Sequence, residues 1–176
     1  MRGGHVGLPD DGRERSLAVA YRVLGDVAVL DADGNPVETL TGKLTSVLAL
    51  LLLRAEAVVP EAKLIEAGDW GSAGNPATQV QKAVSAIRNK VLRRAGQPAE
   101  IETVWGIGYR LTVAAEALDS AAFLRAVKDA DEGPTPQRIA SLRRALAVWS
   151  GTRPLANLPD ELCTDDGPFA GDVTRL

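Results

Sequence analysis

The chain has 176 residues and a net charge of −3, and 45% of its residues are hydrophobic. This length suffices for one domain or two small ones, and the hydrophobic share suffices for a core. The longest apolar run, Val47–Leu53, is far shorter than the ~20 residues that a membrane-spanning helix needs. Cys163 is the single cysteine, which excludes an internal disulfide and leaves a thiol that we expect to be inert. These properties predict a cytoplasmic globular protein.

Charge is distributed unevenly along the chain. Residues 1–16 mix glycine, proline, aspartate and arginine without an apolar stretch of the signal-peptide type, so we expect a flexible leader. Residues 17–113 hold ten basic and ten acidic residues, whereas residues 114–176 hold seven basic and ten acidic ones. Five basic residues and no acidic residue lie between Trp70 and Ala99. Such a stretch inside a neutral segment favours binding to a polyanion.

The first elements predicted are short strands. Tyr21–Leu24 and Val27–Leu30 are apolar runs separated by Gly25 and Asp26, a pattern typical of a strand pair joined by a tight turn. After a second turn, Val37–Leu40 predicts a third strand. The sequence therefore predicts a small antiparallel sheet ahead of the helices.

Three helices are predicted next. Leu44–Ala55 is apolar on most sides, which is typical of a buried helix, and Pro60 opens a second, short one. The third begins at Asn75 and Pro76, where asparagine is a good N-cap and proline suits the first helical position, and it runs to about Arg94. Its inward stripe consists of Val80, Val84, Ile87 and Val91, and its opposite, polar face carries Thr78, Lys82, Ser85, Asn89 and Arg93.

A hairpin and two further helices follow. Ile101–Trp105 and Tyr109–Val113 are β-prone runs joined by a Gly-Ile-Gly tip, and we expect Trp105 to lie in the core. Leu118–Glu132 and Pro136–Trp149 are amphipathic and predict a helix pair, with Thr135 as the cap of the second helix. We expect Leu142, Leu146 and Trp149 to pack on Phe123 and Val127.

This order predicts an α+β fold. Residues 17–113 read as a winged helix-turn-helix with an N-terminal antiparallel sheet and a C-terminal hairpin wing, and residues 114–176 read as an all-α helix pair. The major groove of DNA admits one α-helix, and the preceding helix braces it across the backbone. The third helix is therefore the predicted recognition helix, and duplex DNA is the predicted partner.

Three blocks of sequence resemble parts of known bacterial regulators. The run Gly106–Leu111, GIGYRL, resembles the wing signature of OmpR/PhoB-type effector domains. Leu48–Ala55 resembles the corresponding helix of SARP-type regulators, the antibiotic regulatory proteins of actinomycetes. Ala145–Gly151, with Pro154–Leu158, resembles the start of the bacterial transcriptional activator domain that follows in that family. The chain is thus similar to SARP-type regulators from about Leu17 to its end.

The resemblance implies that the protein activates transcription of a biosynthetic gene cluster. It implies direct repeats on DNA with protomers in tandem, and recruitment of RNA polymerase by the helical region. It also implies that this region is the first helix pair of a tetratricopeptide-like array and is incomplete here. Because an isolated helix pair leaves an apolar face uncovered, we expect the pair to be ordered but marginal. The next helix is expected to begin near Pro168 and to reach Leu176 after roughly two turns, too short to be stable alone, so we expect Pro154–Leu176 to be loosely held.

The candidate DNA contacts come from the third helix, the first helix and the wing. They are Lys43, Thr78, Gln81, Lys82, Ser85, Arg88, Asn89, Arg93, Tyr109 and Arg110. Gln81 and Asn89 are the best candidates for reading a base, because amides pair bidentately with adenine. Arginines such as Arg93 are better suited to phosphates. Three assignments stay open, since Arg88 could instead pair internally, Lys43 could be an ordinary surface lysine, and Tyr109 is more readily explained by packing.

An enzymatic role is not expected. His5 is the single histidine and lies in the leader, so no histidine-based triad or metal cluster is predicted, and we expect no cofactor. The Gly-x-Gly at the hairpin tip lacks the third glycine of a dinucleotide fingerprint. The competing hypothesis is a helical scaffold that docks proteins with a degenerate winged helix, and a further possibility is the N-terminal part of a larger regulator. The acid-free third helix favours DNA.

Overall fold

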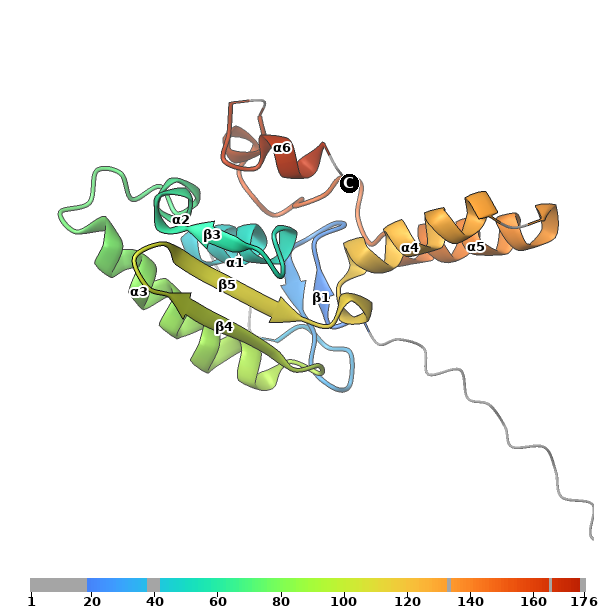
Figure 1. Cartoon of the computed structure of the whole chain (residues 1–176), viewed down its shortest axis with the longest axis horizontal. Coiled ribbons are helices and arrows are strands. Elements are labelled where there is room, and N and C mark those ends of the chain that lie inside the picture. Colours follow the sequence, from blue (N-terminus) through green and yellow to red (C-terminus); the bar gives the residue numbers. More distant parts are fainter. Residues whose placement is uncertain (1–18, 38–41, 133, 165, 175–176) are drawn as a thin grey trace, which may run out of the picture.

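The computed structural model describes residues 19–37, 42–132, 134–164 and 166–174. It has mixed helices and strands, with a two-stranded sheet and a three-stranded sheet, both antiparallel. A winged helix unit is followed by a helix pair and a C-terminal segment (Figure 1). The predicted leader, residues 1–16, lies outside the described residues, as does most of the predicted third strand.

The N-terminal strand pair is confirmed. β1 (Tyr21–Arg22) pairs with β2 (Ala28–Val29), and the turn between them contains Gly25 at φ 135°. A Cβ on Gly25 would lie 2.6 Å from the Ser150 hydroxyl oxygen. Glycine is therefore required here both by the backbone conformation and by the close approach of a segment far along the chain.

The three predicted helices form, and the first is the centre of the core. α1 (Lys43–Leu53) is buried from Thr45 to Leu52, because its sequence is apolar on nearly every side. α2 (Glu61–Ala67) is short and buries Leu64 and Ala67. α3 (Pro76–Ala86) begins as predicted, since the Asn75 side chain accepts the Thr78 N–H at 3.1 Å.

The third helix does not end with α3 but changes its winding. It continues as a π-helical segment, Ile87–Val91, and finishes in a 3-10 turn, Leu92–Arg94. Ile87 and Val91 stay buried through this change, so the predicted apolar stripe is confirmed over its whole length. π-helical turns are rare within helices and often occur at functional sites.

The wing belongs to a three-stranded sheet in the order β3-β5-β4, formed by β3 (Val58–Pro60), β4 (Ala99–Val104) and β5 (Gly108–Val113). The sequence predicts the hairpin but not β3. At the crossing of β3 and β5, a Cβ on Gly108 would lie 2.0 Å from the Val59 carbonyl oxygen. The second glycine of the GIGYRL run is thus needed for the backbones to approach this closely.

The helix pair projects from the winged helix unit. α4 (Asp119–Glu132) and α5 (Thr135–Val148) lie side by side and extend away from α3 and the wing (Figure 1). Phe123 meets Trp149 edge to face at 5.6 Å, as expected. Two details of the prediction are wrong. Thr135 lies within the helix and makes no cap bond, and Leu142 and Leu146 are exposed instead of packed between the helices.

Both ends of the helix pair are fastened to the β1–β2 turn. Asp119, fully buried, accepts backbone N–H groups from Val23 at 2.9 Å, Leu24 at 2.8 Å and Ser120 at 2.7 Å. At the other end, the Ser150 N–H donates to the Leu24 carbonyl at 2.9 Å. Burial raises the pKa of the Asp119 carboxyl, and these N–H groups act in the opposite direction.

Replacing Asp119 with asparagine is expected to destabilise the fold. An asparagine amide turns one carboxylate oxygen into an N–H donor that faces backbone N–H groups, so we expect a loss of about 2 kcal/mol in the free energy of unfolding. Urea denaturation measures this loss. Asp129→Asn, at an exposed position of α4, is the matched control and is expected to change stability little. Equal effects of the two changes would contradict this assignment.

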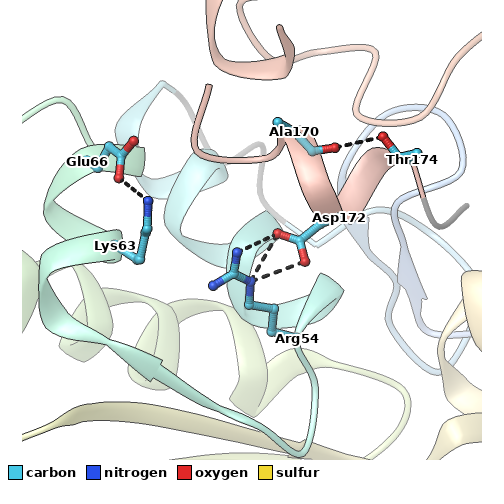
Figure 2. A network of polar contacts seen from close by, with 6 residues as sticks. All are labelled: Arg54, Lys63, Glu66, Ala170, Asp172 and Thr174. Carbon is cyan, nitrogen blue, oxygen red and sulfur yellow. Dashed lines mark hydrogen bonds and ion pairs between the residues drawn. The ribbon is translucent and has the colours of Figure 1, made fainter. Parts of the chain in front are cut away.

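The C-terminal segment packs back onto the winged helix unit, so the expectation of a loosely held tail is wrong. Leu155, Leu158 and Phe169 are buried in the same core as α1. α6 (Ala170–Val173) places Asp172 against Arg54, with carboxylate and guanidinium 2.8 Å apart (Figure 2). The sequence gives no local signal for this docking, because the partner surface lies more than one hundred residues earlier.

Candidate nucleic-acid interface

The third helix presents one polar face to solvent. Its buried side is apolar, and its exposed side carries the predicted contacts. Gln81, Lys82, Ser85, Asn89 and Arg93 are exposed on it. Thr78 is half-buried, and its backbone N–H is already used by the Asn75 cap. The structure thus brings five of the ten predicted contacts together on one accessible face, and no acidic residue of the chain lies between Trp70 and Ala99 to neutralise it.

The Asn89 amide lies back on its own helix. Its Nδ2 donates to the Ser85 carbonyl at 2.9 Å and approaches the Ser85 hydroxyl at 3.3 Å. A bidentate contact with adenine needs both the amide N–H and the amide oxygen. Asn89 must therefore rotate off the helix to read a base in this way. A contact through the amide oxygen alone does not require that movement.

Arg88 adopts the internal alternative. Its Nε and Nη2 donate to the Ile101 carbonyl at 2.9 and 2.6 Å, and Nη2 also donates to the Thr103 hydroxyl at 3.0 Å. The guanidinium lies 6.0 Å from the centre of the Tyr109 ring. These bonds join the π-helical segment to β4 and so fix the angle between the recognition helix and the wing.

The remaining predicted contacts have partners within the chain. Lys43 donates to the Asp69 carbonyl at 2.6 Å and lies 5.9 Å from the centre of the Trp70 ring. Arg110 forms an ion pair with Glu102 across the hairpin. A phosphate contact by either residue has to compete with these partners, although surface ion pairs of this kind are weak.

Tyr109 is a packing residue in this structure. Only 5% of its surface is exposed, in agreement with the packing interpretation. Burial raises the pKa of the Tyr109 hydroxyl, Glu61 raises it further, and Arg88 lowers it. The ring therefore supports the wing from inside.

The tip of the wing differs from the prediction. Trp105, expected in the core, is 90% exposed, and Ile107 is 56% exposed. Trp105 follows the last residue of β4 and precedes Gly106, which has φ 74°. Trp105 lies next to the turn glycine, beyond the last pair of bonded strand residues. This position in the sequence could have indicated that its side chain leaves the sheet. Trp149, which was expected to pack on Phe123 and does so, is half-buried.

A metal-binding cluster and a membrane span are both absent from the described part of the chain. No group of three or more metal-binding side chains occurs there. No helix among the described residues has the length and apolar character to cross a membrane.

Comparison with known proteins agrees with this geometry. Residues 34–111, which include all three helices and most of the wing hairpin, match the family described as transcriptional regulatory protein, C terminal. No curated protein matches the chain. The fold is similar to that of Mycobacterium tuberculosis EmbR, solved in complex with a low-affinity phosphopeptide, with a TM-score of 0.69 and 24% sequence identity. The match covers 88% of this chain and 41% of that chain, so this chain spans less than half of its relative. The matched domain and fold support a DNA-binding transcription regulator.

Proposed function

We propose that the protein is a sequence-specific DNA-binding transcriptional regulator that works in the cytoplasm and has no enzymatic role. The observation that carries the proposal is the exposed, acid-free face of the third helix within a winged helix fold. The third helix enters the major groove, where Gln81 and Lys82 of α3 and Asn89 of the π-helical segment face base edges. Arg93, one helical turn beyond Asn89, meets the phosphates that position the helix.

The finer assignment is a SARP-type activator of a biosynthetic gene cluster. The GIGYRL wing and the Ala145–Gly151 block support it by resemblance. In this proposal residues 17–113 bind DNA as tandem protomers on direct repeats, and residues 114–176 contact RNA polymerase. The acidic excess of the second region favours a protein partner over phosphates.

The helix pair is the proposed first unit of a tetratricopeptide-like array. Its exposed apolar side chains support this, because stacked helix pairs bury such residues on the next unit. These are Leu124, Ile139, Leu142 and Leu146, between 45% and 70% exposed. The same residues favour the second candidate function, a protein-docking scaffold, and the two functions are separated by whether the chain binds DNA.

Selection of bound sequences from random duplex DNA tests the proposal. We expect a defined motif, repeated head to tail near one helical turn. Binding should weaken steeply with rising salt, since each phosphate contact releases counterions. Binding that is absent on every duplex, or that shows no sequence preference, would overturn the proposal. Inverted repeats would overturn only the tandem arrangement.

Asn89→Ala is expected to relax specificity at one base pair of the selected site, by about 1–3 kcal/mol if the contact is bidentate. Competition between the selected duplex and single-base variants measures this. Gln137→Ala, which removes an exposed amide from α5, is the matched control and should leave the preference unchanged. A uniform loss of affinity for all sequences would assign Asn89 to the backbone instead.

A further inference from the structure

The tip of the wing is an exposed apolar surface without charge. No charged residue occurs from Thr103 to Tyr109. Trp105 is 90% exposed and Ile107 is 56% exposed, two positions apart. Single exposed apolar residues are common on proteins, but an indole at the very end of a hairpin, next to a second large apolar side chain, is suited to contact with a partner.

This tip is held rigidly. The Ile107 carbonyl accepts the Glu61 N–H at 3.0 Å, which ties the tip to the start of α2. The Ile107 N–H donates to the Val104 carbonyl at 3.0 Å, which closes the turn. Because its backbone bonds are formed, the turn presents Trp105 from a fixed support.

The tip is also continuous with the recognition face. Trp105, Ile107 and Gln81 line a common cavity of about 210 Å³ between the wing and α3. Gln81 lies on the exposed face of the third helix. A duplex bound to that face therefore passes the wing tip as it continues from the major groove to the adjacent minor groove.

The wing tip is not suited to attracting DNA phosphates electrostatically. Arg110, the nearest cation of the hairpin, is paired with Glu102, and Glu61 on α2 lines the same cavity as Trp105. An uncharged, rigid and apolar tip suits the floor and walls of the minor groove, where apolar side chains enter between base steps and bend the duplex.

We infer that Trp105, supported by Ile107, is an apolar wedge that enters the minor groove beside the segment read by α3 and bends the DNA. The inference rests on the proposed DNA-binding function. Flexible pyrimidine–purine steps unstack most readily, so the wedge favours such a step at its position without a hydrogen bond to any base.

The test uses the full chain and the duplex obtained by selection. The end-to-end distance of the duplex, from energy transfer between terminal dyes, reports bending, and 2-aminopurine at the wedge step reports unstacking. The wild type is expected to bend the duplex and raise 2-aminopurine emission. Trp105→Ala should lose both signals and at least tenfold in affinity, while Trp105→Phe keeps part of each.

Folding and specificity controls accompany these variants. Because the indole is almost fully exposed, Trp105→Ala should leave the melting temperature unchanged. Leu146→Ala, at an exposed apolar position of α5, should bind and bend DNA like the wild type. If the wild type binds no duplex, the proposed function itself fails. If it binds and Trp105→Ala bends and binds equally well, the wedge is wrong.

Discussion

Replacing Phe169 with alanine is expected to lower the free energy of unfolding by about 3–5 kcal/mol, the usual cost of truncating a buried phenylalanine. Phe169 is fully buried and belongs to the cluster around α1. The change leaves a cavity between the C-terminal segment and the winged helix unit. Urea denaturation gives the loss, and amide exchange of α1 and α6 shows where the structure opens.

Leu146→Ala is the control, since Leu146 is 70% exposed and its truncation should cost less than about 0.5 kcal/mol. A similar effect for the two variants would mean that Phe169 does not anchor the segment. The same segment is also held by the ion pair between the half-exposed Arg54 and the buried Asp172, which joins the end of α1 to α6 (Figure 2). Removing the Asp172 carboxylate would leave Arg54 without this partner. We therefore expect an Asp172 variant to loosen the same C-terminal segment as Phe169→Ala.

Neutralising two cations of the third helix, Lys82→Ala with Arg93→Ala, is expected to reduce DNA affinity strongly and to lower its salt dependence. If each side chain meets one phosphate, the slope of log affinity against log salt should become shallower by about 1.8. If Lys82 instead reads a base, the slope falls by about 0.9 and the sequence preference changes as well. Titrations at several salt concentrations distinguish these results.

The control variant changes the net charge by the same amount, but on α5 instead of the third helix. Arg138→Ala with Arg143→Ala removes two exposed cations from α5, far from the recognition helix (Figure 1). If DNA binding responded only to the overall charge of the protein, both double variants would weaken it equally. We expect the α5 variant to keep the wild-type slope, because that surface does not face the duplex.

Features set by neighbouring residues were predictable from the sequence. The start of α3 at Asn75 and Pro76 is local chemistry, and its inward stripe follows from helical periodicity over a few turns. The hairpin is likewise a local pairing, with Gly106 and Gly108 at its tip. For the same reason the exposed face of the recognition helix could be listed residue by residue.

Features set by distant partners were not predictable. β3 is three residues long and forms only because β5 lies beside it, some fifty residues later. The docking of Phe169 depends on α1, and the internal bonds of Arg88 depend on where β4 falls. The π-helical segment also lacks a local signature. It keeps Ile87 and Val91 buried, so the periodicity alone indicates an ordinary helix.

The meeting of both ends of the helix pair on Leu24 has a consequence for how such a protein can change. Asp119 accepts the N–H of Leu24 and the Ser150 N–H donates to the Leu24 carbonyl, so the chain leaves and re-enters the winged helix unit at a single residue. In topological terms, α4 and α5 form an insertion whose two ends lie next to each other. Inserted segments whose ends lie close together are tolerated well. Recombination could therefore exchange this arm for another while the DNA-reading surface stays in place, and target choice and partner choice can evolve separately.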